Sequence, residues 1–360
     1  MAMRFAVIMA GGAGERFWPL SRQDRPKQLL RLADPNQTLL EQAVRRVAPL
    51  IPAERVFVVT GRALREPIRK AGLPLPPENV VAEPCKRNTA GCLVYAAAWA
   101  LARLGGEADG LTMAVLTADH RIGGDERFAR TVGAALEAAE REEALVTIGV
   151  RPSRPETGYG YIEAEGEGAV RPVKRFLEKP DAERAREFAA SGRHFWNSGM
   201  FFWRVGVFLR ELGRARPAHA EAARRMAEAL KRGDEAGAAA IFERLEDISI
   251  DYALMEKARR VLMARADFEW DDVGAWDALE RAMPLDKAGN AAVGGPALVD
   301  CRGCVVCNAA GPEKMAVAAL GVEGLVVVVC EDAVLVAPKA RAQEVKKVVA
   351  LLKERGARQV

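Results

Sequence analysis

The sequence predicts an α/β protein in which a mixed, mostly parallel Rossmann-like sheet is flanked by helices and followed by a small β-rich region. Residues 4–9 and 55–60 are apolar runs typical of buried strands, and residues 38–50 between them have apolar positions at helical spacing. A helix between two apolar strands is typical of the βαβ unit of a parallel sheet. After Pro284 the pattern changes, because residues 289–336 consist of short apolar runs broken by glycine and other turn residues.

Length and composition limit the classes of protein that fit this sequence. A chain of 360 residues is long for one core, so we expect two domains, residues 1–285 and 286–360. The net charge is only +4 and no basic block stands out, which argues against a nucleic-acid partner. The sequence has no apolar run of about 18 residues and no cleavable apolar segment near Met1. We therefore expect a cytoplasmic protein without membrane contact.

The remaining elements follow from local patterns along the chain. Thr38 and Glu41 form a capping-box pattern at the start of the first helix. We expect further strands at residues 112–117 and 144–150, and further helices at residues 91–104, 207–245, 249–256 and 341–354.

A glycine-rich turn follows the first strand and is the strongest functional signal in the chain. Residues 9–20 read MAGGAGERFWPL, so backbone N–H groups face open space with few Cβ atoms to block an approaching anion. Arg16 offers a planar fork for phosphate oxygens, and Lys27 offers a compact ammonium that can neutralise one of them. The residues that we expect to bind the nucleotide phosphates are Ala10, Gly11, Gly12, Gly14 and Arg16.

Two commoner phosphate-binding motifs are absent from this turn. The GxxxxGK[ST] pattern of P-loops does not occur, and Phe17 stands where the dinucleotide-binding fingerprint has its third glycine. A tight strand-to-helix turn would also use three glycines, but it would leave the basic pair Arg16 and Lys27 unexplained. The sequence therefore supports neither a P-loop enzyme nor a dehydrogenase.

Residues 11–28, GGAGERFWPLSRQDRPKQ, resemble the signature of the sugar-nucleotide pyrophosphorylases, and specifically of the mannose-1-phosphate guanylyltransferases, also called GDP-mannose pyrophosphorylases. Further motifs follow in the order of that family, so the resemblance extends over about residues 5–276. It implies a nucleotidyltransferase fold with a small β-helix-like C-terminal domain that ends in a helix.

A second motif, EPCKRNTA at residues 83–90, is polar where a short strand ends and a helix begins. Glu83, Asn88 and Thr89 supply a carboxylate, an amide and a hydroxyl that can read a purine edge or a ribose. Asn88 or Thr89 can equally serve as a helix cap. In the resembled family this motif lines the nucleotide base, which implies nucleotide binding by all three residues. Gly91 stands where that family usually has proline.

Aspartates lie at two strand ends, where ligands bind in open α/β sheets. Asp119 follows the apolar run 112–117, and Asp271 and Asp272 follow Trp270. Each is a candidate ligand for Mg²⁺, although Asp119 can instead cap the next turn. Adjacent side chains of an extended chain point to opposite sides, so only one of the second pair can face the site. The resembled family keeps the second, so we assign Mg²⁺ to Asp119 and Asp272.

Three later motifs provide groups suited to a sugar phosphate. Gly158 lies among glycines and tyrosines in TGYGYI, which allow close approach to a sugar ring. Glu178 and Lys179 pair a hydroxyl acceptor with an ammonium for the phosphate, although an exposed pair of this kind is usually solvated surface. Asn197 adds an amide beside an apolar strand. All four resemble the sugar-phosphate side of the family, whereas we interpret Asp251 as structural.

Cys301, Cys304 and Cys307 have side chains suited to a zinc or iron–sulfur site. Odd spacings along a strand place successive side chains on opposite faces, and the next cysteine, Cys330, is distant in sequence. We therefore expect small buried apolar residues here rather than a metal site.

The residues alone indicate a Mg²⁺-dependent enzyme that acts on a nucleoside triphosphate and a phosphosugar. The resemblance narrows the substrates to GTP and α-D-mannose 1-phosphate and the products to GDP-mannose and pyrophosphate. It makes Arg16, Lys27, Asp119 and Asp272 the catalytic residues. In that reaction the sugar phosphate attacks the α-phosphorus in line, so no serine, cysteine or histidine nucleophile is required.

Two alternatives stay open at this point. One is a related enzyme with another base or hexose, because amide and carboxylate groups do not by themselves specify guanine. The other is a non-catalytic regulatory subunit that binds sugar nucleotides, which predicts loss of a metal carboxylate or of the loop lysine. We also expect a possible homodimer through the C-terminal domain, and no fused isomerase domain in the short chain after residue 290.

Overall fold

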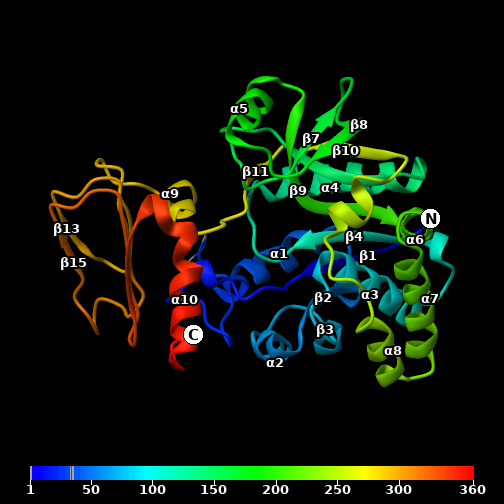
Figure 1. Cartoon of the computed structure of the whole chain (residues 1–360), viewed down its shortest axis with the longest axis horizontal. Coiled ribbons are helices and arrows are strands. Elements are labelled where there is room, and N and C mark those ends of the chain that lie inside the picture. Colours follow the sequence, from blue (N-terminus) through cyan, green and yellow to red (C-terminus); the bar gives the residue numbers. More distant parts are fainter. Residues whose placement is uncertain (1, 33, 35) are drawn as a thin grey trace.

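A nine-stranded mixed sheet forms the centre of the molecule in the computed structural model, which describes residues 2–32, 34 and 36–360 (Figure 1). The strand order is β3-β2-β1-β4-β9-β6-β10-β8-β7. The strands are β1 (Met3–Met9), β2 (Val56–Gly61), β3 (Val80–Glu83), β4 (Leu111–Thr117), β6 (Leu145–Val150), β7 (Tyr161–Ala164), β8 (Val170–Leu177), β9 (His194–Arg204) and β10 (Val261–Arg265). β1 pairs in parallel with β2 and β4, which confirms the predicted parallel core of the sheet.

The second half of the sheet closes on itself. β9 runs antiparallel to β4 and β6, and β7 pairs with both β8 and β9. β10 completes the ring by pairing with β6 and β8. Apolar side chains such as Ile162, Phe195 and Met263 form a small separate core there. The sequence patterns did not predict β7, β8 and β10, because charged residues interrupt β8 and the other two strands are short.

The first helix begins with the predicted capping box. Thr38 Oγ1 accepts a hydrogen bond from the Glu41 N–H (3.2 Å), and Glu41 Oε2 accepts one from the Thr38 N–H (2.6 Å). The helices are α1 (Leu39–Val47), α2 (Arg62–Lys70), α3 (Asn88–Arg103), α4 (Asp125–Arg141), α5 (Ala182–Ala190), α6 (Val205–Ala215), α7 (Pro217–Lys231), α8 (Glu235–Phe242), α9 (Leu279–Ala282) and α10 (Val345–Glu354). None of the helices in the described ranges combines the length and apolarity needed to cross a membrane.

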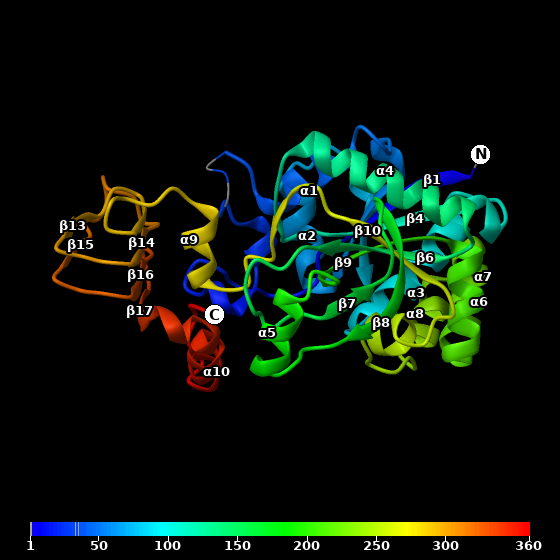
Figure 2. The same cartoon turned by 90° about the horizontal axis from the view of Figure 1, so that it is seen from above.

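Helices cover both faces of the sheet, because alternate residues of its strands face two different cores. Phe5 and Val7 of β1 belong to the core under α3, α6 and α7, whereas Ala6 and Ile8 belong to the core under α1, α2 and α4. Figure 2 shows α4 along one side of the sheet and α8 on the other. This doubly covered sheet is the arrangement expected from βαβ units.

Two predicted helices differ from the structure. The segment 207–245 forms three helices, because Pro217 starts a new helix and Gly233, at φ +75°, ends one. The segment 249–256 forms only a single π-helical turn at Asp251–Met255. Short turns of this kind cannot be distinguished from an α-helix by the spacing of their apolar residues.

A two-stranded ribbon connects two strand ends of the site. β5 (Arg121–Gly123) pairs antiparallel with β11 (Glu269–Asp271), and Asp271 lies opposite Arg121. This register places the residues just before β5 beside the residues just after β11. The ribbon therefore brings Asp119 and Asp272 to one edge of the sheet.

The C-terminal region stacks short parallel strands, as the β-helix-like prediction requires. One sheet has the order β12-β14-β16-β17, in which the first three strands are parallel, and β13 pairs in parallel with β15. The strands are β12 (Ala291–Val293), β13 (Ala297–Val299), β14 (Val305–Asn308), β15 (Ala318–Leu320), β16 (Leu325–Val329) and β17 (Val334–Pro338).

The three clustered cysteines are buried inside this region. Cys304 and Cys307 face different apolar cores, as the alternation predicts, but Cys301 shares the core of Cys304. The prediction of strict alternation was wrong for Cys301 because this residue precedes β14 and lies outside any strand. Its thiol contacts the carbonyl oxygens of Val299 (3.4 Å) and Ala319 (3.2 Å).

The C-terminal region packs directly against the glycine-rich loop. Phe17 and Trp18 belong to the same apolar core as Val326 and Val345. The carbonyl oxygen of Gln359 accepts hydrogen bonds from Trp18 Nε1 (2.6 Å) and Arg22 Nη1 (2.7 Å). Both views place α10 beside this loop (Figures 1 and 2). The loop is therefore held from outside the domain that carries it.

We predict that a chain ending at Glu354 has a less ordered loop at residues 15–22. The truncation leaves the buried Trp18 N–H without its acceptor, which costs about 1–3 kcal/mol. Hydrogen exchange of the backbone amides should accelerate within residues 15–22 and not in β4. Lys353→Ala is the control, because it removes only an exposed ion pair with Glu15. Equal exchange rates in the truncated and full chains would contradict the bracing role.

Candidate active site

Lys27 lies at the centre of the candidate site. Its side chain is only 7% exposed, and its ammonium donates to Asp119 Oδ2 (2.9 Å) and to the carbonyl oxygen of Asp272 (2.6 Å). Gly14 permits this position, because a Cβ on Gly14 would lie 2.3 Å from the Cβ of Lys27. Gly14 also has φ +63°, which a glycine adopts without strain.

The glycine loop is anchored at its start and open at its centre. The carbonyl oxygen of Ala10 accepts from Gln28 Nε2 (2.8 Å) and Thr60 Oγ1 (2.9 Å). Gly11 and Gly12 are exposed, and a Cβ on either would meet no atom within 4 Å. Free backbone N–H groups in such a loop suit an anion such as a phosphate. Ala10 is itself buried, so it anchors the loop.

Arg16 lies at the open side of the loop. Its side chain is exposed, and Nη1 lies 3.5 Å from the carbonyl oxygen of Gly274, two residues after Asp272. A guanidinium in this place retains donors for an anion. The structure thus places Arg16, Lys27, Asp119 and Asp272 around one region, as the sequence analysis expected.

The adjacent aspartates of β11 point to different partners. Asp271 is buried and its carboxylate accepts from Arg281 Nε (2.6 Å) and from the Val273 N–H (2.8 Å). Asp272 instead accepts from the hydroxyl of Tyr159 (2.5 Å). Val273 has φ +45°, a strained value for a β-branched residue. Asp271 is therefore a structural residue, and Asp272 is free to face a ligand.

Charge keeps Asp119 ionised despite its surroundings. Burial raises the pKa of its carboxyl, but the Lys27 ammonium and the His120 ring more than offset this, so the net pKa is lowered. His120 Nδ1 accepts from Trp270 Nε1 (3.1 Å), and burial lowers the pKa of this imidazole. His120 Nδ1 also bonds Thr117 Oγ1 (2.7 Å), so the ring is held in the wall of the site.

The donor set fits Mg²⁺ only together with a ligand. Within residues 2–32, 34 and 36–360, no group of three or more His, Cys, Asp or Glu side chains could hold a metal ion. Mg²⁺ commonly takes one or two carboxylates and completes its shell with water and phosphate oxygens. Asp119 and Asp272 fit that pattern, because the described part of the chain places no hydrogen-bond donor within bonding distance of one carboxylate oxygen of each.

A second cluster lies next to the aspartates. Asn197 Nδ2 donates to Asp251 Oδ1 (2.9 Å), and Asn197 Oδ1 accepts from Thr147 Oγ1 (3.1 Å). Glu178 reaches the same place, since a Cβ on Gly160 would lie 2.5 Å from Glu178 Oε2. Burial and the nearby Glu178 raise the pKa of Asp251 to about 6. The cluster offers carboxylate and amide groups suited to sugar hydroxyls.

Gly158 and Lys179 lie further from this cluster than the sequence analysis expected. Gly158 is exposed, and its N–H donates to Glu156 Oε1 (3.1 Å), whereas Gly160 is the glycine that contacts Glu178 and Asn197. The Lys179 side chain is 63% exposed, and its ammonium lies 3.1 Å from Glu178 Oε1. It can reach a ligand only by moving from this pair.

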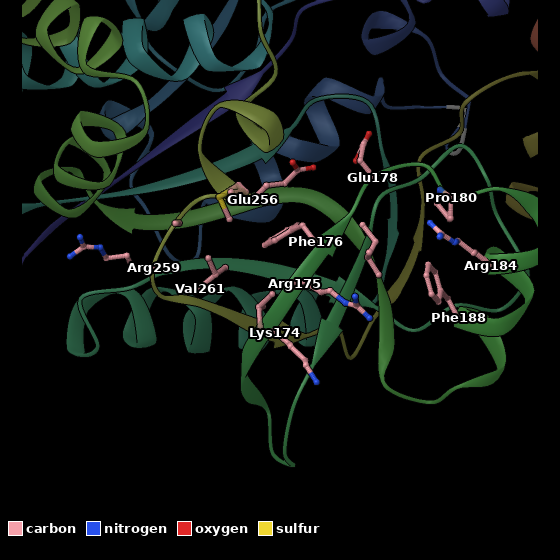
Figure 3. A pocket seen from close by; sticks show the side chains of 14 residues that line it. Lys174, Arg175, Phe176, Glu178, Pro180, Arg184, Phe188, Glu256, Arg259 and Val261 are labelled. Atoms are coloured by element: carbon pink, nitrogen blue, oxygen red, sulfur yellow. The ribbon is translucent and has the colours of Figure 1, made fainter.

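A cavity of about 470 Å³ opens beside Glu178 rather than beside Lys27 (Figure 3). Its walls come from β8, α5 and residues 255–261, and Figure 3 labels Phe176, Arg184 and Glu256 among them. Glu178 is thus shared between this cavity and the Asn197 cluster.

The motif at residues 83–90 contacts the Asn197 cluster from a third side. Thr89 Oγ1 accepts from the Ile250 N–H (2.8 Å), so this hydroxyl is not a helix cap. Asn88 is exposed with φ +55°, and its Oδ1 accepts from the Thr89 N–H (2.9 Å). Gly91 donates its N–H to the Arg87 carbonyl (3.1 Å), a bond that a proline there could not make.

Glu83 is separate from these contacts. Burial raises the pKa of its carboxyl to about 7, and Oε1 has no hydrogen-bond partner among the described residues. The pKa of the neighbouring Cys92 thiol is raised by burial and by Glu83. The structure gives no contact between Glu83 and Asn88 or Thr89.

A continuous chain of contacts joins the three motifs. Thr89 bonds residue Ile250, and the next residue, Asp251, bonds Asn197. The Asn197 N–H donates to the Gly160 carbonyl (2.8 Å), and the preceding residue, Tyr159, bonds Asp272. The site is therefore one surface that runs from the loop to the motif at residues 83–90.

Sequence analysis did not single out two residues of this surface, Tyr159 and Gly160. Both lie in a motif already recognised, but only the register of β7 against β9 selects between Gly158 and Gly160. Asp251, which we interpreted as structural, accepts from Asn197, 54 residues away in sequence.

Comparison with known families agrees with this geometry. Residues 5–289 match the model of the family described as nucleotidyl transferase. Residues 296–352 match the model described as the MannoseP isomerase/GMP-like beta-helix domain. The matches confirm the resemblance and the fold class inferred from the motifs.

Individual relatives are similar over nearly the whole chain. The mannose-1-phosphate guanylyltransferases of Klebsiella pneumoniae and Escherichia coli are each 39% identical over 362 aligned residues, which cover 98% of this chain and 74% of each relative. A crystal structure described as a mannose-1-phosphate geranyltransferase from Thermus thermophilus is 40% identical. It superposes with a TM-score of 0.85 over 97% of this chain and 99% of that one.

We predict that Glu83→Gln stabilises the fold at high pH. The pKa of Glu83 is raised from 4.5 to about 7, so its contribution is fully favourable below pH 4.5 and is lost as the pH rises through 7. This loss is worth roughly 3 kcal/mol. Urea unfolding should show Glu83→Gln more stable than the parent at pH 8 and similar to it at pH 4. The same difference in unfolding free energy at both pH values would contradict the interpretation that Glu83 is a buried carboxylate without a compensating partner.

We predict a large loss of stability for one of the two adjacent aspartates and a small change for the other. Asp271→Asn removes the charge that compensates Arg281 and should cost roughly 2–3 kcal/mol of unfolding free energy. Asp272→Asn keeps an acceptor for Tyr159 and should change it by less than about 1 kcal/mol. Equilibrium unfolding measures both. A larger loss for Asp272→Asn than for Asp271→Asn would reverse the assignment of their roles.

Proposed function

This chain belongs to the nucleotidyl transferase family, and from that premise we propose that it is a mannose-1-phosphate guanylyltransferase. It would join GTP and α-D-mannose 1-phosphate into GDP-mannose and release pyrophosphate. The observation that carries the proposal is the Lys27 ammonium, which contacts Asp119 and the backbone of Asp272 beside a loop with open glycines. An enzyme that joins two polyanions needs this combination of cation, carboxylates and free N–H groups.

The reaction is a nucleotidyl transfer. A phosphate oxygen of the sugar phosphate forms a bond to the α-phosphorus of GTP, and the bond from that phosphorus to the bridging oxygen of the leaving pyrophosphate breaks. The attacking group is already anionic near neutral pH, so the protein supplies position and charge rather than a base. The N–H groups of Gly11 and Gly12 with the Arg16 guanidinium would hold the triphosphate, and Lys27 would contact the phosphates of both substrates.

Mg²⁺ is the proposed cofactor, and Asp119 and Asp272 would hold it. When bound, it would supply positive charge against the phosphate oxygens. Lys27 would then offer its ammonium to a substrate phosphate in place of Asp119. The free carboxylate oxygens of both aspartates, together with the exposed side of the loop, support this assignment.

The sugar phosphate is proposed to lie on the Asn197 cluster. Glu178 and Asn197 would contact the hexose hydroxyls. Gly158 and Gly160, which have no side chains, would leave space for the sugar ring, and Lys179 would contact the phosphate. The motif at residues 83–90 would lie on the base side, with Thr89 fixed by the Ile250 N–H and Asn88 exposed. The contact chain between the two motifs supports this division of the site.

The activity assay described below also distinguishes this reaction from transfer of another group. The Thermus thermophilus structure is described as that of a geranyltransferase, but the charged groups around Lys27 favour a triphosphate over an isoprenoid chain. A different base or hexose would need the same phosphate contacts. A non-catalytic sugar-nucleotide sensor is disfavoured because Arg16, Lys27, Asp119 and Asp272 are all present.

Two further proposals concern the state of the protein. We place it in the cytoplasm, where its substrates would be formed.

We also propose a homodimer through the C-terminal domain, because this domain exposes the apolar side chains Leu320 and Val336, which are 71% and 62% exposed. Light scattering of the eluting protein during gel filtration tests the dimer.

The experiment that tests the activity is pyrophosphate release with GTP and mannose 1-phosphate. We expect release that depends on both substrates and stops when a chelator removes the divalent cation. Replacing GTP by ATP, UTP, dTTP or geranyl diphosphate, and mannose 1-phosphate by glucose 1-phosphate, should lower the rate. Asp272→Asn should lower kcat at least about 100-fold, which corresponds to roughly 2.7 kcal/mol. Chelator-resistant release or preference for another pair would contradict the proposal.

We predict that Lys179→Ala mainly raises KM for mannose 1-phosphate, by about tenfold, because an ammonium facing a phosphate is a charge-assisted contact. The KM for GTP should stay within about twofold of the parent. Lys174→Ala is a matched control, since Lys174 is also exposed and pairs with a different carboxylate, Glu165. An unchanged KM for the sugar phosphate would remove Lys179 from the site.

A further inference from the structure

We propose that the Tyr159 hydroxyl is a positioning group for the transfer reaction, and that it holds the Asp272 carboxylate so that one oxygen stays turned toward the divalent cation. The inference rests on the proposed function, since it concerns the same site. It adds a residue that the sequence motifs suggested only as packing beside a sugar ring.

The first step is the direction of the hydrogen bond. Tyr159 Oη lies 2.5 Å from Asp272 Oδ1 and 3.2 Å from Arg154 Nη2. A guanidinium can only donate, so the phenol oxygen accepts from Arg154. The single phenol proton is therefore committed to Asp272. Arg154 is itself fixed by Glu156, whose Oε2 lies 3.3 Å from Arg154 Nε.

The second step is the rigidity of the tyrosine ring. The ring packs edge to face against Trp196, at a centroid distance of 5.2 Å, and against Trp270, at 5.3 Å. Arg154 lies over Trp196, 5.0 Å from the ring centroid. Trp196 on β9 and Trp270 on β11 thus both pack against the Tyr159 ring and restrict its rotamer. A hydroxyl on such a ring is held in place without further contacts.

The third step is what the contact leaves free. The phenol occupies Asp272 Oδ1, and a Cβ on Gly274 would lie 3.0 Å from Asp272 Oδ2. Gly274 therefore leaves space around the second oxygen.

The two aspartates are thus oriented by different means. Asp119 is held by the charged Lys27 ammonium, which also attracts a substrate phosphate, whereas Asp272 is held by a neutral phenol. Hydrogen-bond partners of metal-binding carboxylates keep the ligand oxygens in place, and their loss typically lowers metal affinity 10–100-fold. Tyr159 has this relation to Asp272.

The test compares Tyr159→Phe with the parent, because phenylalanine keeps the ring packing and removes only the hydroxyl. Mn²⁺ binding to the full chain is followed by the EPR signal of free Mn²⁺ in the presence of GTP and without sugar phosphate, and it is compared with GTP alone, because the two aspartates need phosphate oxygens to complete the metal site. We expect the Kd for Mn²⁺ to rise at least about tenfold in Tyr159→Phe. In steady-state assays the Mg²⁺ concentration for half-maximal rate should rise, and kcat should fall more than KM for mannose 1-phosphate rises.

A control and a second variant keep the test decisive. Tyr95→Phe removes another largely buried phenol, on α3, and should leave the Kd for Mn²⁺ unchanged. If Tyr159→Phe unfolds, Arg154→Met replaces it as the test, since this change keeps a long side chain beside Trp196 and removes the donor that directs the phenol proton, together with the ion pair to Glu156. We expect it to raise the Kd for Mn²⁺ in the same direction.

Three outcomes have distinct meanings. A Kd for Mn²⁺ in Tyr159→Phe within about twofold of the parent would overturn the inference, and so would a parent protein without a saturable Mn²⁺ site. If the parent makes no GDP-mannose but Tyr159→Phe weakens Mn²⁺ binding, the proposed function fails and the positioning role stands. If the parent makes GDP-mannose and the Kd for Mn²⁺ is the same in Tyr159→Phe and in the parent, the proposed function stands and the positioning role of Tyr159 fails.

Discussion

The site depends on one buried charge, the ammonium of Lys27. A buried cation is stable only with partners, and here they come from two strand ends far apart in sequence, Asp119 and the backbone of Asp272. The same lysine sets the path of the loop, because its Cβ occupies the space that Gly14 leaves open. One interaction thus places the glycine loop, the aspartates and the β5–β11 ribbon relative to one another.

The rest of the fold supports that interaction from two sides. The C-terminal β region and α10 share an apolar core with Phe17 and Trp18, so the small domain acts as the outer wall of the loop. On the inner side, Tyr159 and Trp270 pack against each other, Tyr159 donates to Asp272, and Trp270 donates to His120, the residue next to Asp119. Substitutions on either side would therefore act on the site without touching a substrate.

The sequence predicts the parts of the site that depend on local chemistry. The glycines after β1 and Asp119 after β4 are recognisable because these parallel strands end at one edge, and the Thr38 capping box is a purely local pattern. The choice of Gly160 over Gly158 was not predictable, because it depends on how β7 pairs with β9. The contact of Tyr159 was missed for a related reason, since its partner Asp272 lies 113 residues away. The predicted boundary between domains at residues 285 and 286 stays a prediction, as does the role of Glu83.

The most direct test of the account is a crystal structure of the protein with GTP and Mg²⁺. We expect the metal ion to contact carboxylate oxygens of both Asp119 and Asp272, with the triphosphate lying along the N–H groups of residues 11–16 and the Lys27 ammonium on a phosphate oxygen. A metal ion bound away from either aspartate, or a triphosphate bound outside the glycine loop, would contradict the central claim.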